Sequence, residues 1–383
     1  MERLYWNNDW KFAETWEEAM KEAVYPENEM EDVRLPHTCK ELPYHYFDEH
    51  AYQMLCGYRR HFMAPEAWQG KSVELTFEGV AHDAVVYVNG TEVKAHHCGY
   101  TAFFVEIAKY LKYGEDNVLA VRVDSRENLN IPPFGYAIDY MTFGGMYREV
   151  YVQVRNKTHL ADVFVKPQIH PLQVTTEITV QNISDGITLQ QEIRKKGEGA
   201  YSPLGKKPVK QTNVQTVFPV QEIRLWEPEN PYLYEIRTSL WKNGEMIDAR
   251  VDITGFREAG FRKDGFYLNG KKLRLRGLNR HQSYPYVGYA APASMQIFDA
   301  DILKKELGVN AVRTSHYPQS QDFIRRCDEI GLLVFTEFPG WQHIGGEEWK
   351  RQAMQNLKEM IVQYRNHPSI ILWGVRINES QDD

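Results

Sequence analysis

Polar and apolar residues alternate in short segments over the first 157 residues. Segments with this pattern lie at residues 73–79, 117–125 and 148–154. Residues 83–93 form two further segments around Asn89-Gly90, a dipeptide that favours a two-residue hairpin turn. Evenly spaced strands separated by turn residues are typical of an antiparallel sandwich or jelly roll. We therefore expect a jelly-roll domain over residues 1–157, in which the acidic residues 16–32 form a surface segment.

The same alternation continues through a second region, residues 158–257. Its predicted strands lie at residues 161–169, 173–182, 189–196, 232–245 and 249–256. Asn243-Gly244 is another hairpin signal within the fourth of them. Residues 195–210 are rich in glycine, proline and lysine, and we expect a loop there. About 100 residues of such strands predict an immunoglobulin-like sandwich.

After Phe261 the pattern changes to short apolar strands that alternate with amphipathic helices. The predicted strands are residues 273–279, 311–317, 332–338 and 370–376, and the predicted helices are residues 299–308, 320–331 and 347–366. This alternation indicates parallel βα units, either in a doubly wound sheet or in a barrel. No G-x-G-x-x-G turn follows the first strand, which disfavours a dinucleotide-binding sheet. We expect residues 258–383 to form the first half of a (β/α)8 barrel.

Side chains that can ionise or donate hydrogen bonds follow each of the four predicted barrel strands. They are Asn279, Arg280 and His281 after the first, Arg313, Ser315, His316 and Tyr317 around the second, Glu337, Trp341 and His343 after the third, and Asn378 and Glu379 after the fourth. A single residue of this kind is commonly an ordinary loop residue. Four successive strands that end in this way predict an active site, because a (β/α)8 barrel places its catalytic groups at the carboxyl ends of its strands.

Composition and charge narrow the class of protein. The formal net charge of -7 argues against nucleic acid or an anionic membrane as partner, since both attract basic surfaces. No apolar run is long enough to cross a bilayer, and the first residues lack the pattern of a secretory signal. The cysteines show no paired spacing and are expected to be reduced. A cytoplasmic protein is therefore expected. Aromatic residues make up 13% of the chain, which suits both sandwich cores and the stacking of sugars.

Motifs of one protein family extend along nearly the whole chain. They are Gly144-Gly145-Met146-Tyr147-Arg148-Glu149-Val150, Leu225-Trp226-Glu227-Pro228-Glu229-Asn230-Pro231-Tyr232-Leu233-Tyr234, Gly277-Leu278-Asn279-Arg280-His281, Asn310-Ala311-Val312-Arg313-Thr314-Ser315-His316-Tyr317-Pro318, and Asn366-His367-Pro368-Ser369-Ile370-Ile371-Leu372-Trp373 leading into Asn378-Glu379. With these motifs the chain resembles glycoside hydrolase family 2, the group of β-galactosidases, β-glucuronidases and β-mannosidases. The resemblance implies the same three-part fold that the hydrophobic pattern predicts.

The resemblance also implies a role for each candidate residue of the barrel. Glu379 matches the general acid/base of retaining β-glycosidases, which must protonate the glycosidic oxygen because that oxygen is otherwise a poor leaving group. Asn378 is similar to the family's donor to the sugar 2-hydroxyl. His281 and His316 match positions that hydrogen-bond sugar hydroxyls. Arg313 resembles the arginine that orients the nucleophilic carboxylate.

Three further positions concern the sugar and the metal. Asp139 falls where the β-galactosidase branch has an aspartate that reaches the sugar, although a solvated loop aspartate is the alternative. His343 matches a histidine of the family's magnesium loop, but Trp341 stands where that loop carries a carboxylate. Because magnesium prefers oxygen ligands, the resemblance implies no metal and no cofactor here. Trp341 and His343 are instead expected to contact the sugar.

These features together predict a retaining hydrolase of β-linked glycosides or oligosaccharides. A β-galactosidase is favoured, with β-glucuronide as the alternative sugar. In the family the nucleophilic glutamate follows a later barrel strand, so the printed chain by itself is expected to be inactive. A non-catalytic carbohydrate-binding protein and a fragment that complements a separate polypeptide stay open as alternatives. The open strand edges and uncovered apolar face of a half barrel favour pairing with a second copy, and hence a homo-oligomer.

Overall fold

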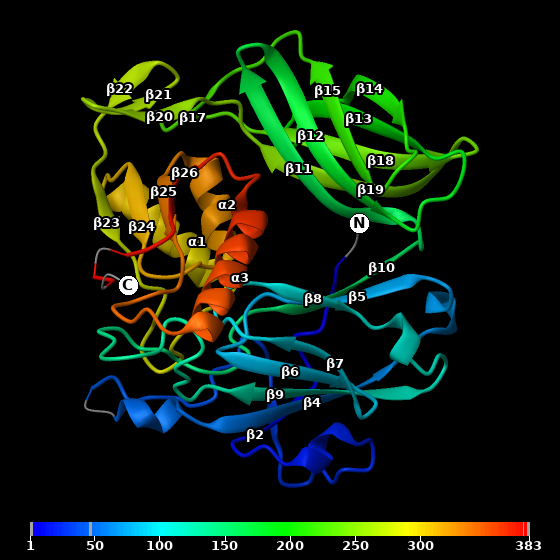
Figure 1. Ribbon diagram of the computed structural model, residues 1–383, viewed down its shortest axis with the longest axis vertical. Helices are drawn as coiled ribbons and strands as arrows, with labels where there is room; N and C mark the ends of the chain where they lie inside the picture. The colour runs from blue at the N-terminus through cyan, green and yellow to red at the C-terminus, as the bar shows by residue number, and fades with distance from the viewer. Residues whose placement is uncertain (1–2, 46–47, 378, 381–383) are drawn as a thin grey trace.

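The computed structural model describes residues 3–45, 48–377 and 379–380. Figure 1 shows three parts, with the first β region at the bottom, the second at the upper right, and the αβ region at the left beside both. The predicted fold class is confirmed: a jelly roll, an immunoglobulin-like sandwich and a partial barrel follow one another along the chain. No helix in the described part of the chain has the length and apolar character needed to cross a membrane.

The jelly roll consists of two antiparallel sheets that enclose one hydrophobic core. Its strands are β1 Leu4–Tyr5, β2 Trp10–Ala13, β3 Glu31–Val33, β4 Leu55–Met63, β5 Ser72–Phe77, β6 Asp83–Val88, β7 Thr91–His96, β8 Phe103–Glu106, β9 Asp116–Asp124 and β10 Val150–Arg155. Short 3-10 helices lie between them at η1 Glu18–Lys21, η2 Glu49–Tyr52, η3 Glu66–Trp68 and η4 Ala108–Tyr110. One sheet has the order β1-β10-β5-β8 and the other β3-β2-β4-β9-β6-β7. Apolar side chains from alternate positions of both sheets form the shared core.

Two local predictions for this domain have different outcomes. The hairpin between β6 and β7 turns at Asn89 and Gly90, whose φ angles of 50° and 81° lie in the left-handed region that asparagine and glycine tolerate. Residues 16–32, in contrast, are more than a surface segment. Trp16 and Met20 are buried and pack against β4 and β9 in a satellite cluster of the core. Acidic neighbours hid this apolar pattern.

The second region is a sandwich of two antiparallel sheets. Its strands are β11 His159–Ile169, β12 Leu172–Gln181, β13 Thr188–Lys195, β14 Ser202–Pro208, β15 Asn213–Pro219, β16 Trp226–Glu227, β17 Asn230–Pro231, β18 Tyr234–Lys242 and β19 Glu245–Thr254. The sheets have the orders β11-β12-β15 and β14-β13-β18-β19. The predicted loop at residues 195–210 is wrong over part of its length, because β14 pairs with β13 at the edge of the second sheet. An edge strand needs a partner on one side only, so proline and glycine are tolerated there.

The third region begins with a small antiparallel sheet and continues as parallel βα units. Strands β20 Ala259–Arg262, β21 Gly265–Leu268 and β22 Lys271–Leu273 form the small sheet, and the parallel sheet has the order β23-β24-β25-β26. The alternating units are β23 Gly277–Asn279, α1 Ala293–Asp301, the π-helical turn η5 Ile302–Glu306, β24 Ala311–Thr314, α2 Gln321–Ile330, β25 Leu333–Glu337, α3 Glu347–Tyr364 and β26 Ile370–Gly374.

Most boundaries of this region follow the sequence signals, with two corrections. Helix α2 has Ser320 as its N-cap and ends on Gly331, which has a φ of 71°. The predicted strand 273–279 is wrong in its middle, because residues 274–276 separate β22 from β23 and the two strands belong to different sheets. The predicted helix 299–308 begins earlier, at Ala293, after the N-cap Pro292, where the missing N–H of proline costs no helix hydrogen bond.

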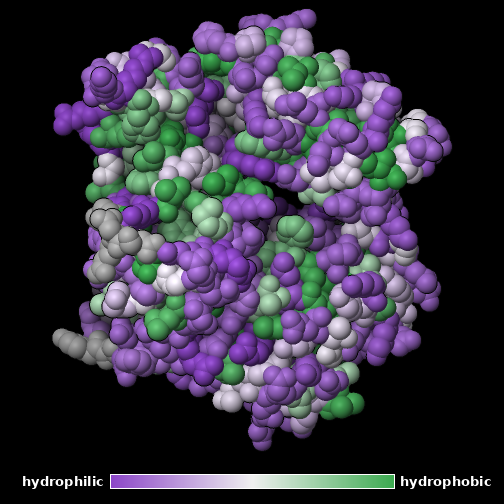
Figure 2. Space-filling view, viewed as in Figure 1, coloured by the Kyte–Doolittle hydropathy of each residue, from purple (hydrophilic) through white to green (hydrophobic). Residues whose placement is uncertain are grey.

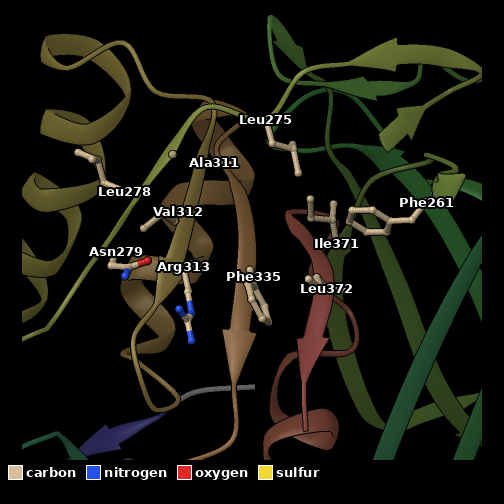
Figure 3. A pocket seen from close by; sticks show the side chains of 11 residues that line it. Phe261, Leu275, Leu278, Asn279, Ala311, Val312, Arg313, Phe335, Ile371 and Leu372 are labelled. Atoms are coloured by element: carbon tan, nitrogen blue, oxygen red, sulfur yellow. The ribbon is translucent and has the colours of Figure 1, made fainter. Parts of the chain in front are cut away.

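One face of the parallel sheet is an open apolar hollow. Its lining residues are Phe261, Leu275, Gly277, Leu278, Asn279, Ala311, Val312, Arg313, Phe335, Ile371 and Leu372 (Figure 3). Figure 2 shows hydrophobic side chains gathered on the same side of the molecule, over the four-stranded sheet. Leu278 and Leu372 are exposed there to 48% and 37%. Such strands are apolar on both faces in parallel sheets, because both faces are normally covered.

Candidate active site

The core of the jelly roll extends beyond its own domain to the carboxyl ends of the barrel strands. Tyr289, Tyr317, Trp341 and Ile377 belong to the same buried cluster as the interior side chains of the jelly-roll sheets. They come from the segments that follow β23, β24, β25 and β26 respectively. The four strand ends are therefore held together by contacts with the first domain.

A buried carboxylate organises the centre of this region. Glu337, the last residue of β25, is only 1% exposed. Its Oε1 accepts a hydrogen bond from Arg313 Nε at 2.7 Å, and its Oε2 lies 3.2 Å from Nδ1 of His316. A buried charge is tolerated when it is paired and hydrogen-bonded, as it is here. The predicted residues Arg313 and His316 are thus brought together on Glu337.

The second histidine lies beside the first. The rings of His281 and His316 are 5.5 Å apart at 73°, and Nδ1 of His281 lies 3.1 Å from the hydroxyl of Tyr317. Burial and the nearby His316 lower the pKa of His281, while the charge of Asp139 opposes them. His281 is accordingly neutral at pH 7, with one ring nitrogen that donates and one that accepts. Asp139 itself is exposed and close enough to act on His281 electrostatically.

Tyr140, which follows Asp139 in the jelly-roll loop, fills the space between these groups. Its ring centroid lies 5.6 Å from that of His281, 5.7 Å from that of His316 and 5.6 Å from that of Trp341. Trp341 also contacts His316, with 4.8 Å between the ring centroids, and is only 4% exposed. The indole is therefore largely covered by protein side chains.

His343 lies against the same jelly-roll loop. Its ring contacts Tyr136 edge-on at 5.3 Å and Trp349 of α3 at 6.0 Å. A Cβ built on Gly135, which has a φ of 121°, would lie 2.2 Å from ring atoms of His343. Glycine at this position thus permits the close approach of the loop to the barrel.

The candidate acid/base lies in a turn that follows β26. Ser380 N donates to Ile377 O at 3.2 Å, and Ser380 Oγ donates to Trp341 O at 3.0 Å, so the turn is fixed on the segment after β25. Glu379 is half-buried, and its Oε2 is buried without a hydrogen-bond partner among the described residues. This carboxyl group therefore has an unused oxygen in a turn that is hydrogen-bonded to the Trp341 backbone. The predicted residue Asn378 lies outside the described residues.

Carboxylates that could hold a metal ion gather elsewhere. Glu78, Glu149 and Asp322 have ligand atoms within 4.8 Å of one another, where the end of the jelly-roll sheet meets α2. Arg3 lies 3.6 Å from Glu78, and Arg325 forms an ion pair with Asp322. These guanidinium groups supply the balancing charge. Within the described part of the chain, no candidate metal group includes His343.

Sequence reasoning gave no role to Glu337 and missed Tyr140. Glu337 was visible only as one polar strand end among several, and its importance rests on the pairing with Arg313 and His316. Tyr140 gave no signal except its place next to Asp139. The sequence cannot assign a residue of the jelly roll to a site in the barrel, because the contact between the two domains is seen only in the three-dimensional structure.

Comparison with known sequences matches the chain to one family in three consecutive pieces. The sugar binding domain of glycosyl hydrolases family 2 matches residues 31–155, a further domain of the same family matches residues 158–257, and its TIM barrel domain matches residues 260–382. The beta-galactosidase of Thermoanaerobacter pseudethanolicus is 48% identical over 99% of this chain and 52% of its own length. That of Thermoanaerobacterium thermosulfurigenes is 46% identical over 98% of this chain and 54% of its own length.

Solved structures give the same result. The structure of Bacteroides uniformis beta-glucuronidase 2, covalently bound to a cyclophellitol-6-carboxylate aziridine, superposes with a TM-score of 0.90 at 29% identity, over 97% of this chain and 46% of that one. The chain thus spans about half the length of the relatives that it matches. The matches cover each of its three parts in the same order. This chain belongs to glycosyl hydrolases family 2.

Proposed function

We propose that this protein is a retaining β-glycoside hydrolase in which Glu379 is the general acid/base. The observation that carries the proposal is the buried, unpartnered Oε2 of Glu379, in the turn that follows barrel strand β26 and that Ser380 fixes on Trp341 O. A polar atom that is buried without a partner is costly, and at the end of a barrel strand a ligand atom can supply the missing partner. Here the ligand atom is the glycosidic oxygen that receives the proton.

The chemistry requires a second carboxylate, the nucleophile. It attacks the anomeric carbon while Glu379 protonates the departing oxygen, and water activated by Glu379 then releases the sugar from the enzyme. In retaining enzymes the two carboxyl groups lie about 5–5.5 Å apart. Glu337 is unsuited to that role, because Arg313 and His316 already occupy its oxygens. We therefore assign no nucleophile among the described residues and expect the printed chain alone not to hydrolyse glycosides.

The remaining groups are arranged to bind the sugar. Neutral His281 can both donate and accept a hydrogen bond, His316 is oriented by Glu337, and Asp139 offers a carboxylate from the jelly-roll loop. Trp341 and His343 complete the wall of this site. In this proposal residues 1–157 contribute to sugar binding, residues 158–257 support the barrel, and residues 258–383 carry the chemistry.

A β-galactoside is the substrate we favour. The relatives at 48% and 46% identity are named beta-galactosidases, whereas the beta-glucuronidase of Bacteroides fragilis is 32% identical. Substrate specificity is shared more often between more similar sequences. A β-glucuronide is the alternative, and the two sugars differ in a carboxylate that a direct assay distinguishes.

The test compares two leaving groups in the natural gene product that contains these residues. Replacement of Glu379 by glutamine should lower kcat/KM for an alkyl β-galactoside by about 10²–10⁴-fold, the usual contribution of general acid catalysis. A dinitrophenyl β-galactoside needs no protonation to leave, so its glycosylation step should be much less affected. Glu115→Gln, which changes an exposed glutamate of the jelly roll, is the matched control.

Two results would overturn the proposal, and a third would overturn only the expectation that the printed chain is inactive. Equal loss on both substrates would show that Glu379 is not the general acid. Hydrolysis of neither β-galactoside nor β-glucuronide by the natural product would favour a carbohydrate-binding role. Turnover by the printed 383-residue chain alone, abolished in Glu379→Gln, would show that its nucleophile is among these residues.

A further inference from the structure

One jelly-roll side chain touches the ends of three successive barrel strands. The ring of Tyr140 contacts His281 after β23, His316 and Tyr317 after β24, and Trp341 after β25, with centroid separations of 5.5–5.7 Å. The contact with Trp341 is edge-to-face at 87°. Aromatic rings at these distances and angles attract one another beyond simple burial. No other part of the jelly-roll loop that is described here makes ring contacts with all of these groups.

The hydroxyl of Tyr140 makes no comparable contribution. It is buried and has no hydrogen-bond partner among the described residues. The hydroxyl therefore holds no neighbouring described group of the site through a hydrogen bond. Burial also raises the pKa of Tyr140 well above its usual range, so the phenol stays neutral and cannot serve as a base. Whatever Tyr140 does for the site, it does through its ring.

We propose that Tyr140 is a positioning residue, whose ring holds His281, His316 and Trp341 in the arrangement that binds the sugar. Small displacements of such groups have large effects, because binding and catalysis depend on positions fixed to about 0.5 Å. The jelly roll thereby controls the barrel site through a side chain that does not touch the substrate. The inference deepens the proposed function, and one arm of its test is independent of activity.

The first arm measures the ionisation of His281 in the printed chain by histidine NMR titration. Tyr140→Ala removes the ring that covers His281, so the lowered pKa of His281 should rise towards its ordinary value. The other groups that face it, His316, Asp139 and Arg280, stay in place. Tyr140→Phe keeps the ring and should leave the titration of His281 unchanged. Identical titration curves for the wild type and Tyr140→Ala would overturn the proposal, whether or not the protein is an enzyme.

The second arm measures kcat and KM on a β-galactoside in the natural gene product. Tyr140→Ala should raise KM about 10-fold or more with a smaller change in kcat, whereas Tyr140→Phe should stay within about twofold of the wild type. Tyr87→Ala is the matched control, since Tyr87 is an equally buried jelly-roll tyrosine that stacks on Trp16. It should lower stability without changing KM.

The outcomes distinguish a role of the Tyr140 ring from a role of its hydroxyl and from a general effect on stability. A loss in Tyr140→Phe as large as in Tyr140→Ala would show that the hydroxyl binds the sugar and would overturn the proposal. A KM in Tyr140→Ala equal to that in Tyr87→Ala would reduce Tyr140 to a core residue. If the wild type hydrolyses no glycoside, the proposed function fails, and the NMR arm still decides the positioning role.

Discussion

The jelly roll contacts the carboxyl ends of the barrel strands, and the immunoglobulin-like sandwich contacts their amino ends. At the carboxyl ends the jelly roll makes a continuous buried joint around Arg148. Its Nη1 donates to Glu78 O at 3.2 Å and Tyr100 O at 3.0 Å within the jelly roll, and its Nη2 donates to Gln282 Oε1 and Pro318 O, both at 3.0 Å, in the barrel. One guanidinium thus links the two domains with the fixed fork of donors that only arginine has.

At the amino ends the immunoglobulin-like sandwich makes the corresponding joint around Trp226. Its Nε1 donates to Asp328 O at 2.8 Å at the end of α2, and its buried ring contacts Leu333 at the start of β25. Asn366, just before β26, accepts from Val165 N and donates to Val163 O, both at 3.0 Å. None of these contacts involves a residue of the proposed site.

The contrast shows why the two β domains are not interchangeable. The jelly roll sends Asp139 and Tyr140 into the region where the strands end, so its docking decides the shape of the site. The sandwich meets the opposite end, where barrels place residues that serve stability. Damage to the amino-end joint should therefore weaken the fold and spare sugar binding, whereas damage to the carboxyl-end joint should affect both.

Loss of the Trp226 side chain should have the largest effect on stability. Trp226→Ala removes a fully buried indole and its hydrogen bond to Asp328 O, which should cost about 3–5 kcal/mol of the free energy of unfolding. Urea unfolding measures this loss of stability, and hydrogen exchange of the amides in β24–β26 shows whether the barrel strands are affected. KM for the sugar should not change in the folded protein. Trp241→Ala, which removes a half-buried indole that bonds Ser239 within the same sandwich, should leave the joint intact. A raised KM in Trp226→Ala would contradict the division of roles.

Loss of the Arg148 guanidinium should have a smaller effect on stability, but it should also weaken sugar binding. Arg148→Met keeps most of the bulk and leaves buried acceptors on both domains without donors, which should cost about 2–3 kcal/mol. Because Gln282 and Pro318 adjoin His281 and Tyr317, KM should rise as well. Arg126→Met, which removes an exposed jelly-roll arginine paired with Asp124, is the control and should change neither quantity. An unchanged KM in Arg148→Met would show that the joint does not control the site.

The smallest effect concerns the protonation of Glu149 next to Arg148. Burial and the neighbouring Glu78 raise the pKa of Glu149 to about 7, well above the value of about 4.3 of a free glutamate. Below about pH 4.3 the Glu149 carboxyl is protonated in both the folded and the unfolded protein, so its burial does not reduce stability. As pH rises towards 7 the unfolded protein releases this proton first, and the folded protein loses stability relative to it. Glu149→Gln should therefore be more stable than the wild type at pH 8, with the gap closing towards pH 5.

Thermal unfolding at both pH values measures this difference. Glu41→Gln, which changes an exposed glutamate of the same domain, provides the baseline. A gap that widens towards pH 5 would show that Glu149 is charged in the folded protein. The contacts around Arg148 would then stabilise a charged Glu149 carboxylate, although burial by itself disfavours the charged form.

The elements that could be predicted are those with a strong local signal. Asn89-Gly90 turns a hairpin because both residues tolerate a positive φ, and Gly331 ends α2 for the same reason. The four apolar strands of the barrel were visible because parallel strands are buried on both faces. The strand β14 was missed, because an edge strand pairs on one side only and its residues need not be apolar or branched.

The sequence by itself determined which kinds of side chain follow each barrel strand, since strand ends and helix starts are local features. It therefore predicted His281, Arg313, His316 and Glu379 as a group. Only the tertiary structure decided that Glu337 pairs with Arg313 and His316, and that Tyr140 of another domain lies among them. The physical reason is that pairing and burial are properties of contacts between distant segments. Such contacts leave no periodic pattern in the chain that forms them.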